Sequence, residues 1–200
     1  MPTEKWFPTP FYYNIIDNVD EVQKELLALV ENTTFEKSDK PDWDKNAATF
    51  SNGYNDGKNM LEVYKPKLFL NELFKNINLF FNDLRFCPEA ANVDVLIRES
   101  WFTRTQKNEY HHRHLHACSE MSGVYYIKTN GNEGSINFYT PTRELFASRI
   151  FVNEANQIVH KPQVGKLILW PSLIEHGVVS NQTDDDRISL SFNIVLRDRI

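Results

Sequence analysis

The sequence lacks the features that define several protein classes. Only two of its 200 residues are cysteine, too few for a disulfide framework. Its apolar runs are only a few residues long, so none could span a bilayer as a helix. Acidic residues (27) outnumber Lys and Arg (22) without any basic stripe, and the N-terminus MPTEKWFPTPFYY does not resemble a signal peptide. These absences predict a cytoplasmic protein with no nucleic-acid or membrane partner.

The composition that is present is that of a globular chain. Apolar residues make up 41% and aromatic residues 13%, enough for a buried core in a single domain spanning residues 1–200. Asn18 and Glu21 have the spacing of a capping box, and apolar residues at helical period then predict a helix ending near Asn32. Pro66 predicts the start of a second helix, whose broad apolar face suits packing on a sheet. Residues 1–92 thus read as a preamble of helices and loops, with a short hairpin expected between Thr33 and Lys65.

From Val93 onward the apolar period changes to two, which predicts strands. The expected strands are Val93–Thr103, Met121–Lys128, Ser135–Tyr139, Ser148–Val152, Gln157–His160, Lys166–Trp170 and Arg187–Leu196. Residues Asn153–Asn156 have the character of a hairpin turn. No helical pattern separates these strands, which argues against a doubly wound parallel sheet. We therefore predict a mainly β fold, a jelly roll or double-stranded β-helix formed by residues 93–200 with N-terminal helices flanking it.

Four of the six histidines fall in the segment YHHRHLHACSE. On a strand, His114 and His116 would point to the same side and could converge on one ion. His176 follows a buried strand in VGKLILWPSLIEH and is a suitable third ligand. Two ligands on one segment and a remote histidine would make a three-ligand face with open metal positions. The competing interpretation, a solvated loop of idle histidines, explains the remote His176 poorly.

The C-terminal strand RISLSFNIVL presents a polar face beside this predicted metal site. Its alternation places Arg187, Ser189, Ser191 and Asn193 on one side of the strand. If that side faces the interior of a barrel, Arg187 offers a fork for a carboxylate, and Ser189 adds a hydrogen bond. An Arg-x-Ser pattern is weak evidence alone, but here it begins eleven positions after a candidate ligand.

The order of HRHLH, SGVYYI, GSINFY, PQVGKLILWPSLIEH and RISLSFN resembles the small iron(II)/2-oxoglutarate oxygenases, in particular a subgroup related to prolyl hydroxylases. The resemblance covers about half the chain, from Val93 onward. It implies a double-stranded β-helix that binds iron(II) through His114 and His176. It also implies that Arg187, helped by Ser189, binds the C5 carboxylate of 2-oxoglutarate. The implied activity is O2-dependent hydroxylation of a peptide or a small molecule, with no catalytic residue beyond the metal site.

One position departs from that family. The acidic ligand is expected two residues after His114, where this chain has His116, so that the iron site is more positive by one charge. Glu120 could supply a carboxylate instead, but its spacing is unfavourable, and we keep His116 as the ligand. Among the aromatic residues, Tyr125 is the predicted cofactor contact, and Tyr126 and Trp101 are further candidates for lining the pocket.

Two alternatives remain at this level. HLHACSE also has the HxHxxxE spacing of the first cupin motif, which would indicate a metal-dependent dioxygenase or isomerase that does not use 2-oxoglutarate. The glycine spacing of that motif is missing, however, and a cupin has no need of Arg-x-Ser. The other alternative is a non-catalytic jelly-roll binding protein. It would leave the grouping of His114, His116, His176 and Arg187 unexplained.

Overall fold

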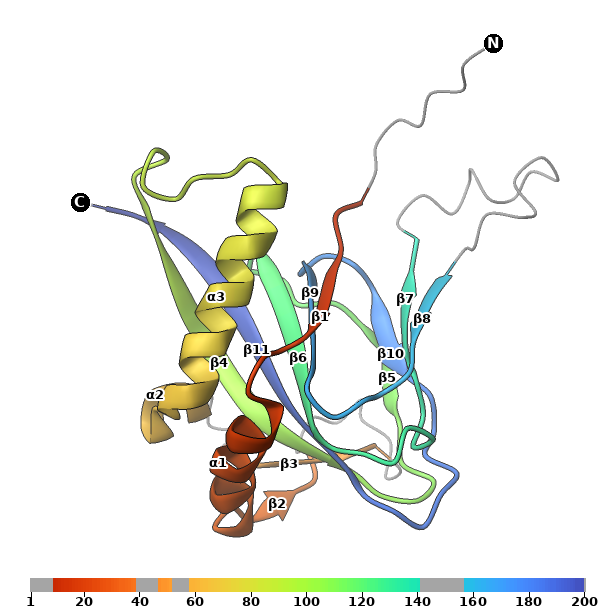
Figure 1. The fold of residues 1–200 in the computed structure, drawn as a ribbon. Coiled ribbons are helices and arrows are strands. Elements are labelled where there is room, and N and C mark those ends of the chain that lie inside the picture. Colours follow the sequence, from red (N-terminus) through yellow and green to blue (C-terminus); the bar gives the residue numbers. More distant parts are fainter. Residues whose placement is uncertain (1–8, 39–46, 52–57, 141–156, 200) are drawn as a thin grey trace, which may run out of the picture.

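Two antiparallel sheets and three helices make up the part of the chain that the computed structural model describes, residues 9–38, 47–51, 58–140 and 157–199 (Figure 1). The helices are α1 (Val19–Glu31), α2 (Met60–Tyr64) and α3 (Lys67–Asp83). The strands are β1 (Tyr12–Ile15), β2 (Phe35–Glu36), β3 (Thr49–Ser51), β4 (Val93–Thr105), β5 (His111–His114), β6 (Met121–Lys128), β7 (Ile136–Tyr139), β8 (Gln157–His160), β9 (Lys166–Pro171), β10 (His176–Val178) and β11 (Arg187–Asp198). The major sheet has the order β1-β9-β6-β11-β4-β3-β2, and the minor sheet β5-β10-β7-β8.

The major sheet is covered on both faces. The helices lie on one face and the minor sheet faces the other, as Figure 1 shows. The larger apolar core fills the space between α1, α3 and the major sheet, and includes Leu26, Leu73 and Leu190. A smaller core, including Val124, Phe138 and Trp170, lies between the two sheets. This arrangement confirms the predicted double-stranded β-helix with flanking helices.

The central strand β11 fixes the position of the candidate site. It pairs along its length with β4 and over its first half with β6, so its residues cannot slip in register. Its side chains alternate between the helix side and the side that faces the minor sheet. A one-residue shift would exchange these two sets, which the apolar core on the helix side prevents.

Most of the predicted elements are present. Strands β6 and β8 have the predicted bounds, and β4, β7, β9 and β11 differ from the predictions by one or two residues at an end. Helix α1 ends at Glu31 with Asn32 as its C-cap, and α3 follows Pro66. The expected hairpin between Thr33 and Lys65 corresponds to the β2–β3 pair. The predicted strand at 148–152 and the turn at 153–156 lie outside the described residues.

Other predictions were wrong or incomplete. Asn18 is the N-cap of α1 but makes no capping bond, because its left-handed backbone (φ 53°) directs its side chain to Glu72 of α3. The preamble is also more than helices and loops, since β1 pairs with β9 and β3 pairs with β4. Helix α2 and the short strands β1, β5 and β10 gave no clear periodic signal, being three to five residues long.

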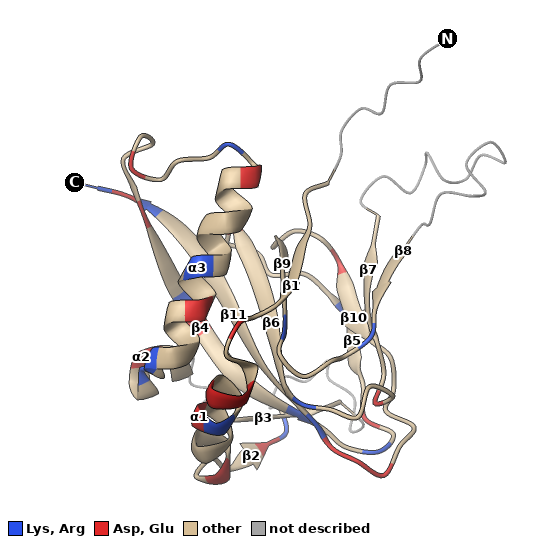
Figure 2. Cartoon of the chain, viewed as in Figure 1, with Lys and Arg blue, Asp and Glu red and all other residues tan. Residues whose placement is uncertain are grey.

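Charged side chains lie mainly on the helices, in turns and near strand ends, while the middles of β6 and β9 carry none (Figure 2). Seven of the eight residues of β6 are buried, which is expected for a strand covered on both faces. In the described part of the chain, no helix is long and apolar enough to cross a membrane.

Candidate metal and cofactor site

Three histidines converge at one side of the cavity between the sheets. His114 ends β5 and His176 begins β10, and the two are paired neighbours in the minor sheet. His116 follows two residues after β5, where its backbone N–H donates to the Ser172 carbonyl at 2.9 Å. One ligand atom from each of the three rings lies within 4.8 Å of the other two. This spacing suits three ligands of one ion.

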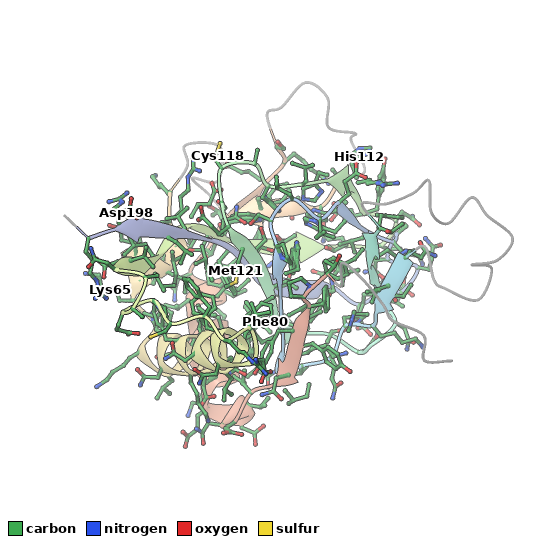
Figure 3. All side chains as sticks on the ribbon, turned by 90° about the horizontal axis from the view of Figure 1, so that it is seen from above. Lys65, Phe80, His112, Cys118, Met121 and Asp198 are labelled. Atoms are coloured by element: carbon green, nitrogen blue, oxygen red, sulfur yellow. The ribbon has the colours of Figure 1, made fainter. Side chains whose placement is uncertain are left out.

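The reason for the convergence differs from the one expected. Strand β5 ends at His114, so strand alternation does not bring His116 to the site. The chain instead turns after β5 through Cys118, which has a left-handed backbone (φ 68°). In Figure 3, His112 and Cys118 mark this segment on the side of the molecule away from α3.

Glu120, the alternative ligand, lies elsewhere. Its Oε2 accepts a hydrogen bond from the Leu196 backbone at 2.9 Å. The residue borders an apolar hollow next to α3 that also involves Phe80 and Met121, both labelled in Figure 3. The structure therefore groups His116, and not Glu120, with His114 and His176.

Two of the rings are already oriented as ligands. His114 Nδ1 lies 2.7 Å from the His112 carbonyl, and His176 Nδ1 lies 3.0 Å from the Ile174 carbonyl. Because a carbonyl only accepts, each Nδ1 carries the proton and each Nε2 keeps a lone pair for a metal. Burial, and then the neighbouring histidines, lower the pKa of His176 well below its usual range, so it stays in the neutral, metal-binding form.

Arg187 is 2% exposed at the start of β11 and has two donors to spare. Its Nη1 donates to the carbonyls of Glu133 (3.2 Å) and Gly134 (2.8 Å), and its Nη2 donates to Thr105 Oγ1 (2.8 Å). A guanidinium has five N–H donors, so among the described residues the Nε–H and one Nη2–H remain, and Nε has no hydrogen-bond partner there. Burial lowers the pKa of Arg187, opposed by Tyr126 and Glu133.

A glycine makes the anchoring of Arg187 feasible. Gly134 has φ 91°, and a Cβ there would come within 2.0 Å of the Val179 carbonyl oxygen. Only glycine can therefore hold the turn that presents its carbonyl to Arg187. The guanidinium is hydrogen-bonded to neutral acceptors, and no ion pair joins it directly to a carboxylate among the described residues. A buried anion would supply the missing counter-charge.

The cavity that these residues line has a volume of about 210 Å³. Ser189, which is 5% exposed, lies beside Arg187 in the lining, and Tyr126 and Trp101 line it as expected. Tyr125 does not: it points to the helix side of β6, where its ring lies 5.1 Å from that of Phe69. Tyr125, predicted to contact the cofactor, therefore lies on the face of β6 opposite the cavity, since neighbours on a strand face opposite ways.

Tyr126 is the tyrosine on the cavity side. Burial raises its pKa to about 12, although the Arg187 charge acts in the opposite direction. Its hydroxyl therefore keeps its proton at neutral pH and can act as a hydrogen-bond donor in the cavity.

The residues present fit the implied iron and 2-oxoglutarate. Three neutral imidazoles are ligands that iron(II) accepts, and they leave further coordination positions open. The unpartnered Nε of Arg187 and the buried, unpartnered Oγ1 of Thr103 both belong to residues of the cavity lining. Arg187 and the three histidines line the same cavity, which therefore offers both a cation and metal ligands to one bound molecule.

Sequence reasoning missed several residues of the site. Thr105, Phe50 and Glu99 have no motif that marks them, because strand pairing brings them to β11 and the cavity. Asn193 could have been found, since it lies on the same polar face of β11 as Arg187 and Ser189.

The structure is a double-stranded β-helix whose three grouped histidines form a candidate metal site. Residues 99–193, which contain this site, match the model of a family described as putative 2OG-Fe(II) oxygenase. The match covers just under half of the chain and indicates an enzyme of the iron(II)- and 2-oxoglutarate-dependent oxygenase class. Of the two alternatives considered above, neither the cupin nor the binding protein is supported by this match.

Solved structures show the same fold at low sequence identity. A 2OG-Fe(II) oxygenase-family protein from Burkholderia pseudomallei has 15% identity and a TM-score of 0.64, covering 93% of this chain and 84% of its own. A Trichoplax adhaerens prolyl hydroxylase, in complex with a hypoxia-inducible-factor peptide, has 13% identity, a TM-score of 0.63 and coverages of 94% and 84%. HygX from Streptomyces hygroscopicus, with nickel, 2-oxoglutarate and hygromycin B bound, has 10% identity and a TM-score of 0.58, covering 94% of this chain and 83% of its own. No curated protein sequence matches the chain.

Proposed function

We propose that His114, His116 and His176 hold the iron(II) of this oxygenase and that Arg187 binds the C5 carboxylate of 2-oxoglutarate. Ser189 and Tyr126 assist Arg187 as hydrogen-bond donors. When bound, iron(II) and 2-oxoglutarate supply the chemistry in which O2 hydroxylates a C–H bond and succinate and carbon dioxide leave. The observation that carries the proposal is a buried cation with spare donors in the same small cavity as three grouped imidazoles.

The protein's own residues bind and orient the cosubstrate and exclude water from the cavity. The Nε–H and remaining Nη2–H of Arg187 lie on one edge of the guanidinium, which suits two-point binding of a carboxylate. Trp101, Phe50 and Trp170 line the cavity with apolar surface, so a bound anion there exchanges water for these fixed donors. The low polarity strengthens the interaction between the anion and Arg187.

The net charge of the site favours binding of dianions. With three neutral ligands, an iron(II) site keeps a full charge of +2, and Arg187 adds a further positive charge. A dicarboxylate therefore compensates most of the charge that the protein places in the cavity. Because His116 stands where an acidic ligand is expected, the site is one charge unit more positive and should bind anions more tightly.

The cavity size bears on the substrate. Pockets for drug-sized ligands usually occupy about 300–1,000 Å³. The cavity of about 210 Å³ suits the cosubstrate and a single reacting group, so the rest of a peptide or small-molecule substrate would lie outside it. We further propose one domain over residues 1–200 and action in the cytoplasm, where the two exposed free cysteines would remain reduced.

The test is an anaerobic titration of 2-oxoglutarate into the iron(II)-loaded protein, followed by the charge-transfer absorbance of the bound pair. Arg187→Ala should lose on the order of 2–5 kcal/mol, a thirtyfold or greater weakening of 2-oxoglutarate binding, with iron content nearly unchanged. Arg187→Lys should retain part of the binding, because the charge survives but the planar fork does not. Absence of the band in the wild type at millimolar 2-oxoglutarate would refute the proposal, and equal binding by wild type and Arg187→Ala would refute the anchor.

A further inference from the structure

The three histidines are held differently at Nδ1. For His114 and His176 the partner is a backbone carbonyl, which accepts. For His116 the neighbour is the side-chain amide nitrogen of Asn193, 3.3 Å from Nδ1. An amide nitrogen only donates, so His116 Nδ1 must accept here. Nδ1 of His116 therefore accepts a hydrogen bond, whereas Nδ1 of His114 and Nδ1 of His176 each donate one.

The orientation of Asn193 is set by its other neighbours. Its Nδ2 donates to Glu99 Oε1 at 2.6 Å, and its Oδ1 accepts from Ser122 Oγ at 2.7 Å. The reversed amide would bring its oxygen against the Glu99 carboxylate, two acceptors at hydrogen-bond distance. Asn193 and Ser122 are 0% and 1% exposed, so the Asn193 amide is shielded from bulk solvent and depends on these protein partners. The two amide hydrogens are therefore directed to Glu99 and His116.

This orientation determines the tautomer of His116. A neutral imidazole whose Nδ1 accepts carries its proton on Nε2. His114 and His176 instead present Nε2 as a free lone pair, the form in which a histidine binds a metal ion. Two of the candidate ligands are therefore in the binding tautomer, and the third is in the other.

We propose that Asn193, oriented by Glu99, is a positioning residue that keeps His116 in the tautomer with Nε2 protonated and so makes it a weak, conditional third ligand. His114 and His176 take the ion first. His116 joins through Nε2 only when its proton moves to Nδ1 and the Asn193 amide turns over against Glu99. This inference rests on the proposed metal site, but the tautomers exist in the metal-free protein and can be measured there.

The first test is the tautomer of each ring in metal-free wild-type protein, from long-range ¹H–¹⁵N NMR correlations of the imidazoles. We expect Nδ1–H for His114 and His176 and Nε2–H for His116. An Nδ1–H tautomer for His116 would overturn the inference. Because no metal is present, this result does not depend on the proposed function. Failure of the wild type to bind Co(II) would count against the proposed site and leave the tautomer result standing.

The second test exchanges donor and acceptor without changing shape or total charge. In the double variant Glu99→Gln with Asn193→Asp, residue 193 accepts from His116 Nδ1–H and from the new amide at 99. His116 should change to the Nδ1–H tautomer, and calorimetry with Co(II) alone should show about tenfold tighter binding, the usual scale of such outer-shell effects. Unchanged or weaker binding would overturn the inference.

The matched control is Asn76→Asp, the same chemical change at a buried asparagine of α3 on the other side of the major sheet. It should alter neither the His116 tautomer nor Co(II) affinity, and a gain equal to that of the double variant would overturn the role of Asn193. If the double variant does not fold, Asn193→Ala removes the donor to His116 together with the acceptor of Ser122 Oγ. Co(II) affinity should then be unchanged or higher, whereas a fall would mean that Asn193 merely supports the ring.

Discussion

The two faces of β11 carry side chains of opposite character. The helix-side residues, from 0% to 5% exposed, all belong to the larger apolar core: Ile188, Leu190, Phe192 and Ile194. The cavity-side residues are polar: Arg187, Ser189, Ser191 and Asn193. Because side chains alternate along a strand, one residue of β11 packs in the apolar core and the next faces the cavity.

This difference shows how the fold separates stability from ligand binding. The helix side gains its stability by removing apolar surface from water. The cavity side holds a charge and polar groups at fixed positions, which costs stability unless a ligand partners them. The chain can accept that cost because β11 is anchored by its other face and by two neighbouring strands.

The variant expected to destabilise the helix-side face of β11 most is Leu190→Ala. Leu190 is fully buried, so the change leaves a cavity and should lower the free energy of unfolding by about 2–5 kcal/mol. Urea denaturation measures this loss. In the protein that remains folded, Co(II) and 2-oxoglutarate affinities should stay within about twofold, because binding depends on the other face. A large loss of affinity in folded Leu190→Ala protein would show that the two faces are not separable.

The variant expected to weaken ligand binding in the cavity most is His176→Ala. Loss of one of three ligands should weaken metal binding by about 100-fold or more, beyond the range typical of outer-shell changes. Metal analysis and Co(II) calorimetry measure the effect. His160→Ala serves as control, since His160 on β8 packs against Phe11 and lies outside the cluster. Equal metal content in wild type and His176→Ala would remove His176 from the site.

The same contrast explains what could be predicted from sequence. The period of two in β11 is strong because one of its faces is apolar and the other polar, whereas β6 is a nearly continuous run of apolar and small residues; both strands were predicted nearly to the residue. Alternation also placed Arg187 and Ser189 on a shared face. The identity of that face as a cavity wall came from the nearby histidines and not from the alternation, which is equally compatible with solvent.

What escaped prediction depends on long-range pairing. The approach of His116 relies on a turn and on a hydrogen bond to Ser172, contacts that no local pattern encodes. Tyr125 was assigned to the wrong face of β6 because Met121–Ile127 show no clear alternation of polar and apolar residues that would set the phase. Thr105 meets Arg187 only because β4 pairs with β11.

A smaller effect concerns pH and the buried His176. Burial lowers its pKa in the folded protein, so the unfolded chain takes up the proton first as the pH falls below about 6.5. Its contribution to stability is complete above that pH and should fall by up to about 1.4 kcal/mol per pH unit below it. Urea denaturation of metal-free protein between about pH 7.5 and 5.5 measures this dependence. The free energy of unfolding should change less steeply with pH in His176→Gln than in the wild type. Some slope should remain, since the pKa of His111 is lowered in the same way. Parallel curves for wild type and variant would contradict the prediction.

The finest comparison lies within the cavity face itself, between Ser189 and Ser191. Both line the cavity on the same strand, but Ser189 lies two residues from Arg187 and Ser191 lies two residues from Asn193. If Ser189 donates to the carboxylate held by Arg187, Ser189→Ala should weaken 2-oxoglutarate binding by about 0.5–1.5 kcal/mol, the net value of one hydrogen bond. Ser191→Ala removes the same hydroxyl one step further along and should change that affinity by less. Calorimetry with 2-oxoglutarate on Co(II)-loaded protein measures both, with Co(II) affinity itself unchanged. Equal losses in the two variants would mean that the carboxylate is not fixed at the Arg187 end of β11, and a larger loss for Ser191→Ala would place it nearer Asn193.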